Sequence, residues 1–313
     1  MNQTPSSPLP GGTPTPAHER ATDALHGRAL VLGGGGSTGN AWLIGVVAGL
    51  YDAGLDVTAA DLTIGTSAGA TAAAQLGGST PDELFTAALA APPSRPGAAP
   101  GRAAARPVHD HLDRLGRLIA SSEDMADLRR RLGASALELE AASDGTWQAQ
   151  WRTTVAARLP SQEWPRRSVL ITAVAAETGE PVTFDSDSGV DLADAVAASC
   201  ASGLPYRIGG TPYIDGGYRR NENADLAAGH ERVLVLSPLG GRSLHPPAWG
   251  TALAAQVAEL RARGSRVETI VPDGDDEHLF GANAMNPSLR PAAAEAGHKQ
   301  GRALAGRLAE LWS

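Results

Sequence analysis

The stretch Ile64-Gly65-Thr66-Ser67-Ala68-Gly69-Ala70 decides how the rest of the sequence is interpreted. It has the pattern G-x-S-x-G, with an apolar run before it (Leu62 to Ile64) and an alanine-rich run after it (Ala68 to Leu76). An apolar strand followed at once by a helix is the context of a nucleophile elbow, a strained turn that exposes a serine Oγ. Gly65 and Gly69 suit such a turn, because it brings neighbouring backbone very close. The stretch therefore predicts a strand, a sharp turn at its serine and a helix.

A second glycine-rich turn lies one strand upstream. Arg28 to Leu32 is a short apolar run, followed by Gly33-Gly34-Gly35-Gly36-Ser37-Thr38-Gly39 and by helical spacing from Asn40 to Asp52. Successive backbone N–H groups at a helix N-terminus form a cradle for an anion. Such a cradle can hold the oxyanion of an acyl-transfer intermediate. We favour this interpretation for the turn from Gly34 to Gly39.

The pattern Gly34-x-Gly36-x-x-Gly39 also fits the dinucleotide-binding fingerprint, with Asp56 or Asp61 near the position of a ribose-binding acid. A nucleotide-binding oxidoreductase is therefore an alternative, although that fold does not need a nucleophile elbow in its next unit. A P-loop is excluded, because no G-x-x-x-x-G-K-[ST] sequence occurs.

A nucleophilic serine needs a base, and Asp215 is the strongest candidate. It follows β-prone residues and precedes Gly216-Gly217, which places a carboxylate at a strand end in a tight turn. Its ordinary pKa of about 3.9 keeps it ionised at neutral pH, so it can act as the base if it lies within hydrogen-bond reach of the serine Oγ. The later histidines are weaker candidates, because none lies in a segment typical of a triad loop: His109, His111, His230, His245, His278 and His298.

Composition narrows the function classes. The 313 residues carry a net charge of −8 without a basic cluster, which argues against nucleic-acid binding and against attraction to strongly anionic membranes. The single cysteine, Cys200, excludes an internal disulfide and is expected to be a small buried residue. His109-x-His111-x-Asp113 resembles the start of a metal-binding motif, but Arg114 stands where a third histidine is expected. We therefore predict no metal.

The order of the segments predicts the architecture. Residues 1–26 are rich in Pro, Thr, Ser and Gly and are expected to form a disordered arm. Strand-like runs alternating with helical patterns over 27–313 predict one α/β domain, with a mainly parallel central sheet covered on both faces. A variable helical and loop insertion is expected around 91–165, and one amphipathic helix from Pro247 to Arg263.

Three aromatic and apolar residues, Trp147, Trp151 and Val155, recur every four positions and share one helix face. Core packing is the favoured interpretation of this stripe, and contact with lipid is the alternative. The sequence shows neither a signal-peptide pattern nor a run of about 20 apolar residues. A cytoplasmic protein with transient contact at membrane surfaces is therefore expected.

Three motifs stand in one order: G-G-G-G-S-T-G from Gly33, G-T-S-A-G from Gly65, and D-G-G from Asp215. Together they resemble the patatin-like phospholipase family of bacterial lipid acyl hydrolases. The segment from Ala198 to Tyr206 is similar to the family's A-S-x-A-x-P segment, and Asn221 matches an asparagine often found just past D-G-G. The resemblance covers about Arg28 to Leu236.

The resemblance implies roles for these residues. Ser67 would be the nucleophile and Asp215 the base of a Ser–Asp dyad without a catalytic histidine, while Gly35 and Gly36 would supply oxyanion N–H groups. The implied fold is a three-layer α/β/α sandwich related to the α/β hydrolases. The implied activity is cleavage of lipid carboxylic esters by a phospholipase A, lysophospholipase or esterase, with no cofactor.

The sequence departs from the family at Thr38, where an Arg or Lys is usual. The missing cation predicts weaker catalysis, or a substrate preference shifted away from anionic phospholipids. A hydrogen bond from the Thr38 hydroxyl is an alternative source of stabilisation. A regulatory or lipid-binding pseudoenzyme with the same fold is the alternative function.

Overall fold

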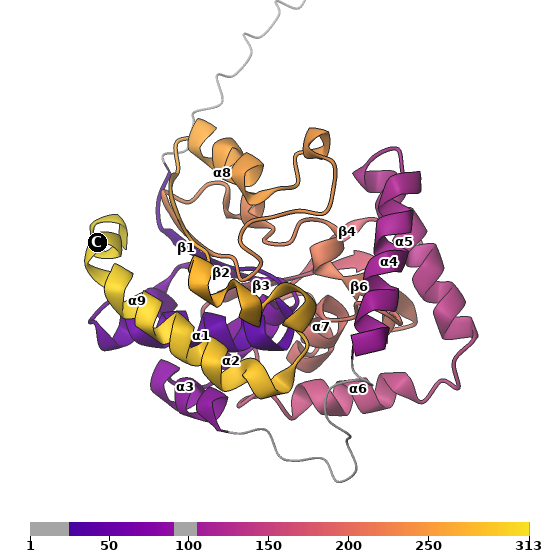
Figure 1. The fold of residues 1–313 in the computed structure, drawn as a ribbon, viewed down its shortest axis with the longest axis horizontal. Coiled ribbons are helices and arrows are strands. Elements are labelled where there is room, and N and C mark those ends of the chain that lie inside the picture. The colour runs from indigo at the N-terminus through magenta and orange to yellow at the C-terminus, as the bar shows by residue number, and fades with distance from the viewer. Residues whose placement is uncertain (1–24, 91–104, 313) are drawn as a thin grey trace, which may run out of the picture.

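The computed structural model describes residues 25–90 and 105–312, so nearly all of the predicted N-terminal arm and part of the insertion lie outside the described residues. A central eight-stranded sheet has the strand order β5-β6-β3-β2-β1-β7-β8, and β4 pairs with β3 (Figure 1). The strands are β1 (Arg28–Leu32), β2 (Leu62–Gly65), β3 (Ser168–Ala175), β4 (Pro181–Phe184), β5 (Tyr206–Ile208), β6 (Thr211–Asp215), β7 (Arg232–Leu236) and β8 (Arg266–Ile270).

The sheet has a parallel part and an antiparallel part. Strands β3, β2, β1, β7 and β8 run parallel, as the alternation of apolar runs and helices predicts. Strands β4, β5 and β6 pair antiparallel. The short turn at Gly179 leaves no room for a crossover between β3 and β4, so these two strands form the predicted hairpin.

Helices cover both faces of the sheet, which confirms the three-layer arrangement. Side chains of β1 alternate: Leu30 and Leu32 face one cluster of apolar residues, and Ala29 and Val31 face another. The first cluster is packed by α1 (Gly36–Asp52), α2 (Ala68–Leu76), α3 (Pro81–Leu89), α7 (Leu192–Ser199) and α9 (Arg290–Trp312). The second is packed by α8 (Leu253–Ala262).

The C-terminal helix α9 lies directly along α1 (Figure 1). Glycines line the crossing at Gly45 and Gly49 of α1 and at Gly297 and Gly301 of α9. A Cβ at any of these positions would overlap backbone atoms of the facing helix, so the two backbones can approach only because side chains are absent. The start of α9 is therefore held close to the start of α1, where the glycine-rich turn lies.

The predicted insertion forms three helices, α4 (Ala105–Ser121), α5 (Met125–Ala141) and α6 (Trp147–Ala156). Helix α5 buries Leu128 and Leu132 against Val174 and Ile214 of the sheet. The α6 stripe packs on the main core, and Trp151 Nε1 donates a hydrogen bond of 3.0 Å to a carbonyl of α7. The core-packing interpretation of the stripe is therefore confirmed.

The prediction of one helix from Pro247 to Arg263 is wrong in its first part. Pro247–Trp249 forms one 3-10 turn, and Gly250 then takes a left-handed φ of 63°, which ends it. The α-helix begins only at Leu253. Among the described residues, no helix combines the length and the apolar character needed to cross a membrane.

Candidate active site

The turn that the sequence predicts to be a nucleophile elbow lies between β2 and α2. Ser67 lies between the last residue of β2 and the first residue of α2, with φ 52° and ψ −111°. L-residues rarely adopt a positive φ, so the surroundings must hold this conformation. The Ser67 N–H donates to Ser199 Oγ at 2.9 Å, and the Thr66 N–H donates to the Leu32 carbonyl at 3.1 Å. The serine itself stays partly exposed.

The two glycines of the elbow are required by close backbone contacts. A Cβ at Gly69 would overlap the carbonyl of Leu32, and a Cβ at Gly65 would lie 2.7 Å from Ala70 Cα. The helix that follows the serine can therefore start against β1 and β2 only with glycine on both sides. This is the physical origin of the G-x-S-x-G pattern here.

Strand β3 brings Asp215 to the elbow. Strands β2 and β6 pair with the same edge of β3, because β4 occupies the opposite edge at Ile171 to Val174. Strand β2 runs parallel to β3, and β6 runs antiparallel to β3. The carboxyl ends of β2 and β6 therefore meet on this edge, opposite Ile171 and Ala173 of β3. Ser67 follows one end, and Asp215 is the last residue of the other.

The Asp215 carboxylate is buried, with 7% of the residue exposed. It accepts a hydrogen bond of 2.8 Å from the Gly217 N–H. Burial raises the pKa of Asp215 to about 6, and the Gly217 N–H and the Ser67 side chain oppose that rise by favouring the charged form. The D-G-G pattern has a steric reason, since a Cβ at Gly216 would overlap Thr172 of β3.

The glycine-rich turn lies at the start of α1. The N–H groups of Gly34 and Thr38 bond the carbonyls of Asn221 and Ala284, each at 3.0 Å. Within the described chain, no hydrogen-bond acceptor is found for the N–H groups of Gly35 and Gly36. Those two backbone groups are thus available to an oxyanion. Ser37 and Gly39 complete the first turn of α1, and the Gly39 N–H bonds the Gly35 carbonyl at 3.0 Å.

Thr38 contacts the segment around Ala284. Its side chain is fully buried, and its hydroxyl lies 3.5 Å from the Ala284 carbonyl as the donor. The hydroxyl thus has a protein carbonyl as its acceptor, and stabilisation of an oxyanion by Thr38 stays an expectation. Thr38 instead attaches the segment around Ala284 to the glycine-rich turn.

A buried polar network, which was not expected from the sequence, contacts the elbow at Thr66. Asn223 has a left-handed φ of 55°, and its Nδ2 lies 3.0 Å from Thr66 Oγ1 and 3.3 Å from Thr172 Oγ1. Thr172 Oγ1 also donates to Thr66 Oγ1 at 3.0 Å. The signal in the sequence that could have indicated this network is Asn223, the second asparagine after D-G-G, two positions beyond Asn221. The network joins β2, β3 and the segment after Asp215, so it holds both sides of the site together.

The described histidine side chains bond elsewhere, as their weak sequence context suggested. His230 and His278 bond backbone carbonyls, His245 bonds Thr251, and His298 bonds Asp52. The side chains of His109 and His111 lie outside the described part of the chain.

The expectation that Cys200 is simply a buried residue is wrong. It keeps some exposed surface, and its Sγ lies 3.2 Å from the Ser67 carbonyl. Enclosure by the surrounding protein and the charge of Asp215 raise the pKa of the thiol to about 12. The group therefore stays a neutral thiol beside the elbow and does not compete as a nucleophile.

The two acids of the dinucleotide interpretation lie at the wrong end of the sheet. Asp61 accepts a hydrogen bond of 2.7 Å from the N–H of Arg28, the first residue of β1. Asp56 caps a short 3-10 turn that precedes β2. The glycine-rich turn follows the carboxyl end of β1, where ligands of open α/β sheets bind. The geometry thus gives no support to a ribose-binding acid.

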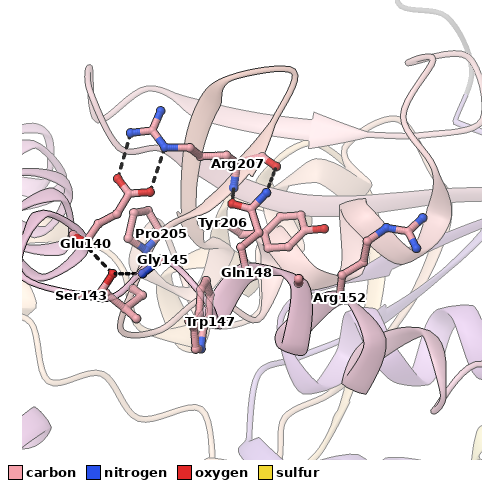
Figure 2. Close-up of a pocket in the computed structure, with 11 residues that line it drawn as sticks. Glu140, Ser143, Gly145, Trp147, Gln148, Arg152, Pro205, Tyr206 and Arg207 are labelled. Atoms are coloured by element: carbon pink, nitrogen blue, oxygen red, sulfur yellow. Dashed lines mark hydrogen bonds and ion pairs between the residues drawn. The ribbon is translucent and has the colours of Figure 1, made fainter.

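A cavity of about 550 Å³ lies between α5, α6 and β5, away from the elbow. Figure 2 shows Trp147, Pro205 and Tyr206 around it, with the Glu140–Arg207 ion pair at its edge. Neither Ser67 nor Asp215 lines this cavity. We therefore assign it no part in the chemistry of the elbow.

Comparison with known families identifies the chain. A sequence model described as "Patatin-like phospholipase" matches residues 30–228, which is more than half of the chain. The chain belongs to the patatin-like phospholipase family. The matched residues include the glycine-rich turn, the elbow and Asp215, but neither α8 nor α9. At a general level, membership supports the hydrolysis of lipid esters.

Solved structures add a distant likeness. VipD from Legionella pneumophila is 14% identical, with a TM-score of 0.42, over 90% of this chain and 67% of VipD. The type III effector protein ExoU is 14% identical, with a TM-score of 0.37, over 89% of this chain and 53% of ExoU. A search of curated proteins finds no match.

Proposed function

We propose that this patatin-like protein hydrolyses carboxylic esters of lipids through a Ser67–Asp215 dyad and an acyl-enzyme. One observation carries the proposal: a partly exposed serine in a strained turn lies beside a buried carboxylate whose pKa is about 6. A base with a pKa near the working pH is ionised often enough to accept a proton and basic enough to take it.

In the first step, Asp215 takes the proton from Ser67 Oγ as that oxygen attacks the ester carbonyl carbon. The carbonyl oxygen becomes an oxyanion, which the N–H groups of Gly35 and Gly36 stabilise. When the tetrahedral intermediate collapses, the C–O bond to the alcohol breaks and protonated Asp215 returns its proton to the leaving alcohol. An acyl group remains on Ser67.

In the second step, Asp215 takes a proton from a water molecule, whose oxygen attacks the acyl carbon. The same N–H groups hold the second oxyanion. Collapse breaks the bond to Ser67 Oγ, which recovers its proton from Asp215, and the fatty acid leaves. The dyad ends as it began, which is the general requirement for a covalent catalytic cycle.

The test is covalent labelling by a fluorophosphonate together with fatty-acid release from a lipid panel. Wild type should label at Ser67 and release fatty acid, Ser67→Ala should do neither, and Asp215→Ala should be strongly impaired in both. Cys200→Ser is a matched control beside the elbow and should keep labelling. Equal labelling of wild type and Ser67→Ala would refute the proposal, and a folded wild type inert in both assays would favour a pseudoenzyme.

A further inference from the structure

Glu222 is a carboxylate that the protein encloses almost completely beside the glycine-rich turn. Only 1% of the residue is exposed, and a Cβ added to Gly33 would lie 3.3 Å from its Cγ. In the described part of the chain, no Arg, Lys or His side chain forms an ion pair with it. A buried charge without a cation is costly unless neutral donors surround it. The proposed chemistry at Ser67 and Asp215 does not use this carboxylate, so it has another role.

Three neutral side chains donate hydrogen bonds to Glu222. Its Oε1 accepts from Asn221 Nδ2 at 3.0 Å and from Ser237 Oγ at 2.7 Å, and its Oε2 accepts from Gln256 Nε2 at 3.1 Å. Ser237 and Gln256 are themselves fully buried. An ionised carboxylate only accepts hydrogen bonds, so it satisfies all three donors at once, which an amide at this position could not do.

The directions of two of these donors are fixed by a second bond. Gln256 Oε1 accepts a hydrogen bond of 2.8 Å from the Ala224 N–H, so its Nε2 must face the carboxylate. Ser237 Oγ accepts a hydrogen bond of 2.9 Å from the Gly241 N–H, which directs its own hydrogen to the carboxylate. A buried network in which every group is satisfied is rigid and holds one arrangement. The carboxylate therefore joins the segment after Asp215, the loop after β7 and helix α8.

Two of the joined segments contact the glycine-rich turn directly. The Asn221 carbonyl accepts the Gly34 N–H at 3.0 Å, and Asn221 Nδ2 donates to the Gly34 carbonyl at 3.3 Å. Ser237 is followed by Pro238, which packs so closely on the turn that a Cβ at Gly35 would lie 2.6 Å from Pro238 Cβ. Because Asn221 and Ser237 both donate to the same carboxylate oxygen, the carboxylate sets how far apart these two contacts on the turn lie.

We propose that Glu222 is a positioning residue for the oxyanion donors. Through Asn221 and Pro238 it holds the glycine-rich turn in the shape that lets the N–H groups available there bond an oxyanion. The inference rests on the proposed function and adds to it a residue that does not touch the substrate. The charge of Glu222 alone would weaken an oxyanion nearby, since like charges repel, so its benefit comes from geometry. Oxyanion donors stabilise most when they are held in place before the reaction.

The kinetic test compares Glu222→Gln with wild type on a short-chain p-nitrophenyl ester, with rates expressed per serine labelled to completion by a fluorophosphonate. The amide keeps the shape of the side chain, but its NH₂ group faces Gln256 Nε2, so donor meets donor. We expect kcat to fall about 10–10²-fold with KM little changed, because a small displacement of the donors acts on the transition state. A rise in kcat would contradict the inference, since it would show an effect of charge alone. A variant that is less stable in urea but keeps its kcat would contradict it too.

The double variant Glu222→Gln/Gln256→Glu is the rescue, because it again places a donor opposite an acceptor between these two positions. The Thr251 carbonyl then loses its hydrogen bond of 3.0 Å from Gln256 Nε2, so part of the lost kcat should return. A folded double variant with a kcat no higher than that of Glu222→Gln would contradict the inference. Glu268→Gln is the matched control, because it makes the same change in a half-exposed ion pair with Arg307 on β8 and should leave kcat unchanged.

A binding measurement separates this inference from the proposed function. An alkyl trifluoromethyl ketone forms a hemiketal with a nucleophilic serine, and its oxygen then needs the oxyanion donors, whereas the matching alkyl ether has no carbonyl to attack. Glu222→Gln should bind the ketone more weakly than wild type by about the factor lost in kcat/KM, and the ether equally well. Equal affinity of both proteins for the ketone would overturn the inference and leave the hydrolase intact. Equal affinity of wild type and Ser67→Ala for the ketone would instead overturn the proposed function.

Ser237→Ala provides a milder change at the same carboxylate. It removes one donor to Glu222 Oε1 and keeps the charge in place. Its kcat and its affinity for the ketone should fall together, by less than in Glu222→Gln. Unchanged values in the folded Ser237→Ala variant would overturn the inference even if Glu222→Gln does not fold.

Discussion

Replacing Asp215 with Asn removes a buried charge and is expected to stabilise the folded protein at high pH. The pKa of Asp215 is raised from its ordinary value of 3.8 to about 6 in the folded state. The folded state therefore binds more protons than the unfolded state between these two values, and stability falls as pH rises through that window. A shift of about 2 pKa units corresponds to about 3 kcal/mol.

The difference in free energy of unfolding between Asp215→Asn and wild type is expected to depend on pH. Near pH 4, Asp215 is protonated in the folded state, so Asp215→Asn and wild type should unfold at similar urea concentrations. From pH 4 to pH 8, the variant should gain about 2 kcal/mol in free energy of unfolding relative to wild type, which is most of the full shift. Urea unfolding followed by tryptophan fluorescence at pH 4, 6 and 8 measures this difference.

Asp187→Asn provides the control, because Asp187 is exposed in the turn after β4 and far from the elbow in sequence. The difference in free energy of unfolding between Asp187→Asn and wild type should stay nearly constant with pH. If Asp215→Asn also shows a constant difference, the carboxylate does not titrate near 6 in the folded state. In that case the assignment of Asp215 as a base tuned by burial is lost as well.

Four further outcomes follow from the same contacts. Hydrolysis by wild type should rise in kcat/KM as pH increases through about 6, because Asp215 must be ionised to accept the proton; a flat profile from pH 5 to 7 would contradict this. Gly35→Ala should lower kcat about 10²–10³-fold, because its Cβ would lie 2.6 Å from Pro238 Cβ and displace an oxyanion donor, as turnover of a short-chain ester will measure. Ser199→Ala removes the acceptor of the Ser67 N–H and should slow fluorophosphonate labelling about tenfold. An unchanged labelling rate would contradict this, because it would show that the turn keeps its shape without that bond. Asn223→Ala should cost about 1–3 kcal/mol in urea unfolding, because buried hydroxyls lose a partner.

Much of the fold was predictable from the sequence, because its signals are local. Short apolar runs that end in glycine marked β1 and β2, and helical spacing marked the helices that follow. The capped start of α3 was equally local, since Thr80 and Glu83 bond one another's backbone across the first turn. The start of α8 was misplaced because Pro247 is also compatible with a 3-10 turn, and the left-handed Gly250 that separates the two segments depends on how the loop packs.

The candidate site likewise has features that the sequence predicts and features that only the tertiary structure decides. The chain itself determines a strained serine turn, a glycine-rich helix start and a carboxylate before two glycines, because each is a short pattern with a steric or chemical reason. Only the tertiary structure decides that β2 and β6 meet end to end on one edge of β3, which brings Asp215 to Ser67 and buries it. The pKa of about 6 follows from that burial and has no local signature.

Arg290, the cation beside the glycine-rich turn, shows most clearly what could not be predicted from the sequence. From the sequence, Thr38 marks the loss of a positive charge, since neighbouring residues offer no replacement. The glycine-lined crossing of α1 and α9 places Arg290 at Ser37 and Asn40, about 250 positions away in the chain. Motifs therefore determined which chemistry the chain carries, whereas helix packing decided which charges surround it, because electrostatic contacts depend on distance in space rather than along the sequence.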